Sequence, residues 1–234
     1  MQQADSMVLE QFADGAAVAV KAVEEIRSAA ARAIAERGRF RILLAGGTTP
    51  LAVYRLLALE MMHWAGWEVY FGDERCLPPQ DPERNSRAAH EALLSAVPIP
   101  GTQVFPVPAE LGAEDAAAAY ALTIARAVPF DLVLLGMGED GHTASLFPGQ
   151  AVDDTRLVVP VHDAPKPPPE RVSLTVPALS SCRRMLVMVT GAGKRDALRA
   201  WRAGADLPIA RAARQGRARV LVDRAALGDA DSED

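Results

Sequence analysis

Residues 131–149 read DLVLLGMGEDGHTASLFPG, and the rest of the chain can be placed around this stretch. Its apolar run, Leu132 to Leu135, is typical of a strand that is buried on both faces. Gly136 and Gly138 end the run with backbone that can turn sharply or let a ligand approach closely. The pattern therefore predicts a glycine-rich loop at the carboxyl end of a core strand, which is where open α/β sheets bind ligands.

An acid and an imidazole, Asp140 and His142, stand two positions apart on this loop. We expect Thr143 to cap a short helical turn that runs to Phe147 and stops at Pro148. A histidine just ahead of such a turn faces the positive end of the peptide dipoles, which disfavours the imidazolium and keeps a neutral base available. The alternative is an ordinary hydrogen-bonded loop histidine, because residues two apart need not face one another.

The composition is that of one acidic globular domain. With 234 residues, half of them apolar, the chain can bury one sizeable core, and we expect a single domain over residues 1–234. The formal charge of −5 argues against a nucleic-acid binder, but it allows an anionic small-molecule substrate because a site needs only a few local cations. The acidic C-terminal end, about residues 228–234, is expected to be disordered.

The sequence predicts no membrane span, secretion signal or metal site. No apolar run approaches the roughly 20 residues that span a bilayer, and the N-terminus lacks the basic and apolar regions of a signal peptide. Cys76 and Cys182 are too few for a disulfide framework or a metal cluster, so reduced thiols in a cytoplasmic protein are the simplest interpretation. His63, His90 and His162 stand at unrelated positions and are expected to be structural or surface residues.

A second glycine-containing loop, GGTTP, follows a strand predicted over Arg41 to Ala45. We expect Thr49 to be the N-cap of the next helix and Pro50 its first residue. Gly46 and Gly47 then offer consecutive backbone amides in front of a helix N-terminus, and together these features make an anion site. The alternative is a tight strand-to-helix turn that binds no ligand.

A third loop reads GDER and follows the strand predicted over residues 67–71, and a helix is expected to start near Asn85 or Ser86. A run of charges such as Asp73, Glu74 and Arg75 usually marks a solvated turn. Because the carboxyl ends of parallel strands gather at one edge of a sheet, these side chains are also candidates for the same site. An arginine there could stabilise a developing oxyanion or orient a carboxylate.

The remaining sequence alternates helices with short strands. Helices are predicted over 14–37 and 113–127, and strands over 103–105, 184–190 and 218–223. Residues 151–170 are expected to be irregular, with PKPPPE extended and exposed, before Arg171 opens a strand that Pro177 ends. Lys194 begins a helix, where a cation is unusual; a bound anion would explain it, and an ordinary surface lysine is the alternative.

Four segments, taken in order, resemble the 6-phosphogluconolactonase family, which is grouped with glucosamine-6-phosphate isomerase/deaminase-like enzymes. They are LAGGTTPLAVYRLL, FGDERCLPPQDPERNSRAA, LVLLGMGEDGHTASLFPG and ERVSLTVPAL. The resemblance implies a modified Rossmann-type α/β fold, with a mostly parallel sheet and helices on both faces. It also implies hydrolysis of 6-phospho-D-glucono-1,5-lactone to 6-phosphogluconate in the oxidative pentose phosphate pathway, without a cofactor.

The resemblance also implies roles for particular residues. His142 matches the catalytic base and Arg75 an active-site arginine, while Asp140 or Asp73 would orient His142. One departure is ERNSR, where a Ser-Asn pair is common before the helix, so a substrate role for Asn85 is not implied. The expected substrate- and phosphate-binding residues are Gly46, Gly47, Thr48, Arg171 and Lys194.

Two other functions remain open at this point. An amino-sugar-phosphate isomerase/deaminase shares the fold and the Asp-Gly-His loop, but carries an acidic residue soon after the histidine. Here no carboxylate follows His142 before Asp153, which favours the lactonase. A sugar-phosphate sensor would bind without turnover; such regulators usually add a DNA-binding segment, for which about 40 residues before the first predicted strand leave little room. The sequence allows a monomer or a homodimer.

Overall fold

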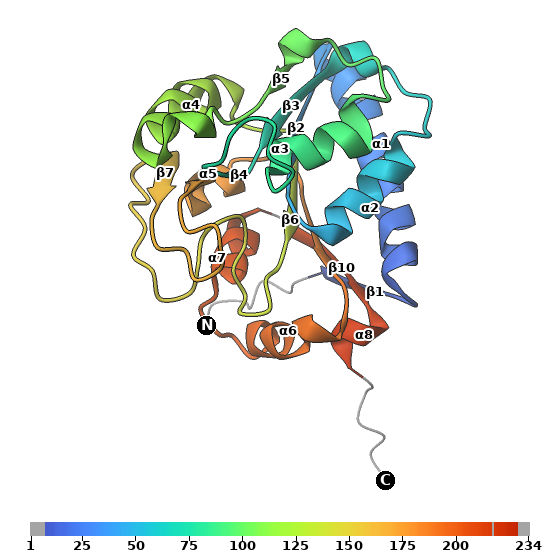
Figure 1. The fold of residues 1–234 in the computed structure, drawn as a ribbon. Helices are drawn as coiled ribbons and strands as arrows, with labels where there is room; N and C mark the ends of the chain where they lie inside the picture. The colour runs from blue at the N-terminus through green and yellow to red at the C-terminus, as the bar shows by residue number, and fades with distance from the viewer. Residues whose placement is uncertain (1–7, 217, 229–234) are drawn as a thin grey trace.

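A seven-stranded, wholly parallel sheet forms the centre of the protein (Figure 1). The computed structural model describes residues 8–216 and 218–228. In spatial order the strands are β1 (Val8–Phe12), β10 (Ala218–Asp223), β9 (Met185–Val189), β6 (Leu132–Gly136), β2 (Phe40–Leu44), β3 (Trp67–Phe71) and β5 (Val104–Phe105). The expected α/β class with a mostly parallel sheet is confirmed.

Helices cover both faces of this sheet (Figure 1). One face carries α1 and α2, and the other carries α4, α5, α7 and a small antiparallel sheet. The helices are α1 (Gly15–Arg37), α2 (Thr48–Leu57), α3 (Asn85–Ala89), α4 (Ala113–Ala127), α5 (Val176–Ser180), α6 (Arg195–Arg202), α7 (Pro208–Gln215) and α8 (Arg224–Leu227). The small sheet has the order β4 (Asp73–Arg75), β8 (Arg171–Leu174), β7 (Val158–Val161). None of the described helices is both long and apolar enough to cross a bilayer.

The strand order reverses between β2 and β6. From β2 the chain moves to β3 and β5 on one side of the sheet, and from β6 it moves to β9 and β10 on the other. The connections that leave the carboxyl ends of β2 and β6 therefore run in opposite directions and leave a crevice between them. This crevice is bordered by the loops that begin at Ala45 and at Met137.

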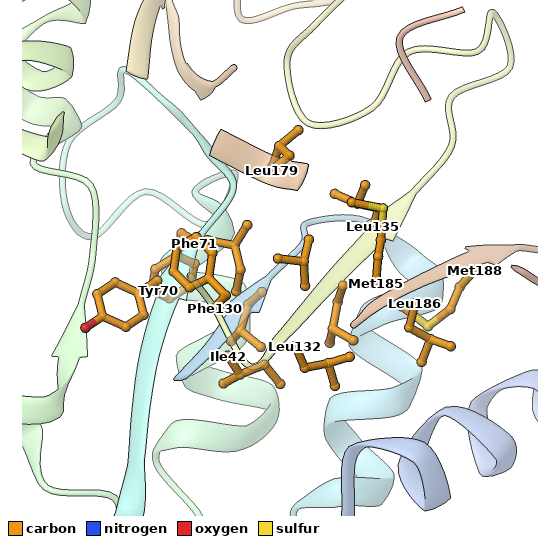
Figure 2. Packing of buried hydrophobic residues seen from close by; sticks show 14 of the residues in the cluster. Ile42, Tyr70, Phe71, Phe130, Leu132, Leu135, Leu179, Met185, Leu186 and Met188 are labelled. Atoms are coloured by element: carbon orange, nitrogen blue, oxygen red, sulfur yellow. The ribbon is translucent and has the colours of Figure 1, made fainter. Parts of the chain in front are cut away.

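Burial on both faces explains the apolar composition of the central strands. The four residues Leu132 to Leu135 of β6 are at most 2% exposed. Figure 2 shows Ile42 of β2, Leu132 of β6 and Leu186 of β9 within one apolar cluster. At roughly 25 cal/mol per Å² of buried apolar surface, this packing is the main stabilising contribution to the sheet that carries the loops.

The N-terminal helix and its caps follow the sequence closely. Asp14 accepts a hydrogen bond from Ala17 N at 2.9 Å, and Gly38 ends the helix in the left-handed conformation with φ 73°. Small residues such as Ala22 and Ala30 face the sheet and are buried, so α1 packs closely against the strands. The prediction of a helix over 14–37 is confirmed.

Several local predictions are wrong. Strand β7 lies inside residues 151–170, which were expected to be irregular, because Val158–Val161 pairs with β8. Strand β1 was not predicted; five residues beside a long helix gave too short a pattern, and pairing with β10 stabilises it. The helix α2 begins at Thr48 with Gly47 in the N-cap position and no side-chain cap, so Thr49 is not the cap. The acidic tail beyond Gly228 lies outside the described residues.

Asp223 joins the end of β10 to the turn that precedes Lys194. Its buried carboxylate accepts hydrogen bonds from Ala226 N at 2.8 Å, which caps α8, and from Gly191 N at 3.0 Å. Asp223→Ala leaves these amides without their acceptor and should lower the free energy of unfolding by about 2 kcal/mol. Urea denaturation measures this loss. Asp14→Ala removes an exposed cap of the same kind and should cost about 1 kcal/mol; a larger loss at Asp14 than at Asp223 would contradict the assignment.

Candidate active site

A cleft of about 320 Å³ opens at the carboxyl ends of β2 and β6. It is bordered by the loops after β2, β3, β6 and β9 and by the segment before β8. Eight of the nine site residues expected from the sequence line it: Gly46, Gly47, Thr48, Asp73, Arg75, His142, Arg171 and Lys194. The ninth, Asp140, is not among the lining residues but contacts His142.

The loop after β6 holds His142 against Asp140. The distance from His142 Nδ1 to Asp140 Oδ1 is 2.5 Å, and the same oxygen accepts the His142 backbone N–H at 3.1 Å. The loop closes through a hydrogen bond from Gly138 N to His142 O at 2.8 Å. A Cβ on Gly138 would lie only 2.0 Å from His142 Nδ1, so the ring fits because residue 138 has no side chain.

Burial keeps the imidazole neutral. Desolvation lowers the pKa of His142 below its ordinary value, although the nearby Asp140 charge acts in the opposite direction. The Phe147 ring, whose centroid lies 4.8 Å from that of His142, supplies part of this apolar cover. A helix dipole contributes nothing, because residues 143–147 form a turn closed by Leu146 N to Thr143 O at 3.0 Å and not the expected helical turn.

The ionised Asp140 fixes which ring nitrogen carries the proton. Burial by itself would raise the pKa of Asp140, but the His142 backbone N–H and ring outweigh that effect and leave the pKa lowered. A carboxylate can only accept a hydrogen bond, so His142 Nδ1 must be the donor in this pair. The lone pair of the neutral ring is therefore on Nε2.

Asp73 has different partners from those expected. It accepts hydrogen bonds from Ser145 Oγ at 2.6 Å and from Asn85 Nδ2 at 2.9 Å, and it makes no hydrogen bond to His142. The geometry therefore favours Asp140 over Asp73 as the residue that orients His142. Asp73 instead links the loop after β3 to the loop that carries Ser145 and His142.

Strand alternation explains why Glu74 is outside the cleft. Successive side chains of β4 point to opposite faces, so Asp73 and Arg75 face the cleft while Glu74 points away. Glu74 is fully buried and accepts hydrogen bonds from Asn85 N at 2.7 Å and from Ser86 N at 2.8 Å. This carboxylate caps the N-terminus of α3 and places Asn85.

Asn85, for which the sequence supplied no role, packs against the glycine loop. A Cβ on Gly46 would lie 2.1 Å from Asn85 Oδ1, so only glycine fits beneath this amide. Gly47 has φ 106°, in the region that favours glycine, and directly precedes α2. Small residues, a helix N-terminus and an adjacent cleft are thus combined as an anion site requires.

The cleft is bordered by four cationic side chains: Arg75, Lys166, Arg171 and Lys194. Arg75 stands directly opposite Arg171 in the β4–β8 register, where like charges repel one another. Arg75 Nε has no hydrogen-bond partner among the described residues. Burial lowers the pKa of Lys194, an effect that a bound anion would oppose. These features favour an anionic ligand.

Lys166 is the cleft residue that the sequence interpretation missed. It was placed in the exposed PKPPPE segment, yet it lines the cleft, with Nζ 3.5 Å from Glu139 Oε2. The sequence could have indicated this position for Lys166. A lysine before three consecutive prolines lies on a stiff segment, and this one lies just before β8.

Comparison with known proteins agrees with this geometry. Residues 13–222 match the family model described as glucosamine-6-phosphate isomerases/6-phosphogluconolactonase. The chain belongs to this family. It is 39% identical to the 6-phosphogluconolactonase of Mycobacterium tuberculosis, over 94% of this chain and 96% of that one.

Solved structures of family members have the same fold. The 6-phosphogluconolactonase of Thermotoga maritima superimposes with a TM-score of 0.85 at 32% identity, covering 93% of this chain and 99% of that one. The 6-phosphogluconolactonase of Trypanosoma brucei gives a TM-score of 0.84 at 27% identity, with 94% and 97% coverage. A monomeric glucosamine-6-phosphate deaminase, 21% identical with a TM-score of 0.82 and 94% and 98% coverage, shares the fold.

A substitution at Gly138 tests the contact between the loop after β6 and the imidazole of His142. Gly138→Ala puts a methyl group where the His142 ring lies, so the ring must move, and a displacement of about 1 Å can lower turnover by about 10²-fold. Gly101→Ala is the matched control, because no atom lies near its added Cβ. Steady-state hydrolysis assays and thermal melts compare the two. Full activity in a folded Gly138→Ala protein would show that the position of the ring is unimportant.

Proposed function

We propose that this protein is a 6-phosphogluconolactonase that hydrolyses 6-phospho-D-glucono-1,5-lactone to 6-phosphogluconate in the oxidative pentose phosphate pathway. The observation that carries the proposal is the neutral His142, paired with Asp140, at a cleft bordered by four cations. The substrate is dianionic at its phosphoryl group and has an electrophilic lactone carbonyl. The two kinds of group in the cleft match these two features, and the 6-phosphogluconolactonase relatives support the same activity.

The reaction needs one base that later acts as an acid. His142 Nε2 takes a proton from water as the water oxygen bonds to C1 of the lactone. The bond from C1 to the ring oxygen then breaks, and the imidazolium returns its proton to that oxygen. The product acid loses its own proton to solvent, so atoms and charges balance. Asp140 holds Nδ1–H throughout and stabilises the transient imidazolium.

The cations and glycines have separate roles. Arg75, whose side chain lines the cleft, stabilises the tetrahedral oxyanion, for which a single donor can be worth roughly 3–4 kcal/mol. Gly46, Gly47 and Thr48, with Lys194, hold the phosphoryl group at the N-terminus of α2. Lys166 adds positive charge near His142 and Lys194, where the PKPPPE segment borders the cleft. Remote phosphoryl binding then positions the reacting carbonyl.

The histidine loop carries no carboxylate between His142 and Asp153, and this separates the proposed function from amino-sugar deamination. The acids close to His142 are Asp140 and Asp73. Asp140 is hydrogen-bonded to the imidazole, and Asp73 is hydrogen-bonded to Ser145 and Asn85. Asp153, the next acid along the chain, is bonded to Thr155 instead. Purified protein should therefore hydrolyse the lactone and release no ammonia from glucosamine 6-phosphate. Ammonia release would favour the deaminase, and binding of 6-phosphogluconate without turnover would favour a sensor.

His142→Ala tests the assigned base. Without the imidazole, turnover of the phosphorylated lactone should fall by about 10²-fold or more, because water is no longer activated. The rate is measured as 6-phosphogluconate formed above the uncatalysed background. His63→Ala, at an exposed position, is the matched control and should retain full activity. A folded His142→Ala variant that kept the wild-type rate would remove His142 from the mechanism.

The pH dependence should report the same residue. The base must be unprotonated, and burial lowers its pKa below 6.5, so kcat/KM should be constant near pH 7 and fall only as the pH drops below 6.5. Asp140→Asn removes a charge that raises this pKa, so the acid limb should move to lower pH. The plateau should fall by about 10²- to 10⁴-fold, because an amide can donate to Nδ1 and so favour the tautomer with hydrogen on Nε2, and because the imidazolium loses its counter-charge. An acid limb that starts above pH 6.5 in the wild type would contradict the assignment.

A further inference from the structure

Arg171 uses its guanidinium on the backbone of the segment that precedes it. The residue opens β8 and is 5% exposed. Its Nε donates to Pro168 O at 2.9 Å, and its Nη2 donates to Lys166 O at 2.7 Å and to Pro167 O at 3.1 Å. Its Nη1 lies 3.4 Å from Ser145 Oγ.

These contacts leave little of the guanidinium for a ligand. An arginine has five N–H groups, of which three point to carbonyls here and a fourth to a hydroxyl. Arginine recognises a phosphoryl group best with two parallel N–H donors from one edge of the fork. With a single N–H left on Nη1, Arg171 cannot bind in this bidentate way while it holds the segment.

The carbonyls that Arg171 binds belong to the segment that carries Lys166. Three consecutive prolines, residues 167–169, have no N–H, so this segment cannot donate hydrogen bonds to a neighbouring strand. Ala164 N donates to Pro169 O at 3.0 Å and closes the loop at its base. Arg171 supplies the remaining donors and thereby fixes the backbone at Lys166, whose side chain lines the cleft.

The same guanidinium is linked to His142 through the Phe147 ring, which contacts both residues. Arg171 Cζ lies 5.6 Å from the centroid of the Phe147 ring, within the range of a cation–π contact. Phe147 also contacts His142, with ring centroids 4.8 Å apart. Arg171 therefore contacts the supports of both Lys166 and His142.

We propose that Arg171 is a positioning residue that fixes Lys166 at the cleft and holds Phe147 against His142, and that it does not itself bind the phosphoryl group. This corrects the role expected from the sequence, and it rests on the proposed function for the meaning of the two supported residues. Arg171→Lys keeps the charge but cannot reach three carbonyls and cover a ring at once.

A double-mutant cycle separates positioning from direct binding. The probe is 6-phosphogluconate, and its dissociation constant is measured by calorimetry for Arg171→Lys, Lys166→Ala and the double variant, with Arg199→Lys as an exposed control. If Arg171 acts through Lys166, Arg171→Lys should weaken binding by at least about fivefold in the wild type and by less than about twofold in Lys166→Ala. The proposal would be overturned if the two single substitutions weakened binding by factors that multiply in the double variant. It would also be overturned if Lys166→Ala left binding unchanged. These binding measurements stand whether or not the lactone is turned over.

Phe147→Leu tests the second contact and does not require Arg171 to be changed. Loss of the ring should lower kcat for the phosphorylated lactone by about tenfold or more while the dissociation constant of 6-phosphogluconate changes by less than about twofold. Arg171→Lys should lower kcat in the wild type but add little in Phe147→Leu. A kcat that Phe147→Leu leaves unchanged, or independent losses of kcat in the double variant, would overturn this half of the proposal.

Discussion

The hydrogen bond between Asp140 Oδ1 and His142 Nδ1, 2.5 Å long, is the interaction on which the rest of the site depends. It sets the orientation of the imidazole, and it determines that the proton is on Nδ1 and the lone pair on Nε2. The bond requires backbone without side chains, because a Cβ on Gly138 would overlap the ring and Gly141 adopts φ 84°. Phe147 then covers the ring and Arg171 lies over Phe147. The protonation of one nitrogen is thus set by several residues packed around the ring.

The position of this pair follows from the sheet. The reversal of strand order between β2 and β6 opens a crevice, and the loops after both strands reach it with glycine-rich backbone. Buried polar residues join the loops to one another: Asn85 contacts Asp73 and packs on Gly46, and Asp73 accepts from Ser145 of the histidine loop. These contacts hold His142, the proposed base, at a fixed separation from the glycine loop, the proposed anion site, as a substrate with a carbonyl and a distant phosphoryl group requires.

The sequence predicted the elements whose causes are local. Apolar runs predicted the core strands, and local composition predicted the first long helix over 14–37 to within one residue of its observed bounds. Because the strands were expected to be parallel, the sequence also predicted that the three loops meet at one edge of the sheet. Features that depend on contacts between segments were missed. Strand β7 forms by pairing with β8, and Asp73 takes its partners from α3 and from the histidine loop. The backbone at Lys166 is held by a hydrogen bond from Arg171. The neutral imidazole was expected for a wrong reason, since burial replaces the predicted helix dipole.

The protonation state of His142 in the free enzyme is the quantity that tests this account most directly. Nitrogen-15 NMR of histidine-labelled protein at pH 7 distinguishes a protonated ring nitrogen from one with a lone pair, and His142→Gln assigns the signal. We expect a neutral ring with hydrogen on Nδ1 and a lone pair on Nε2, because Asp140 accepts from Nδ1. A doubly protonated ring at pH 7, or a neutral ring with hydrogen on Nε2, would contradict it.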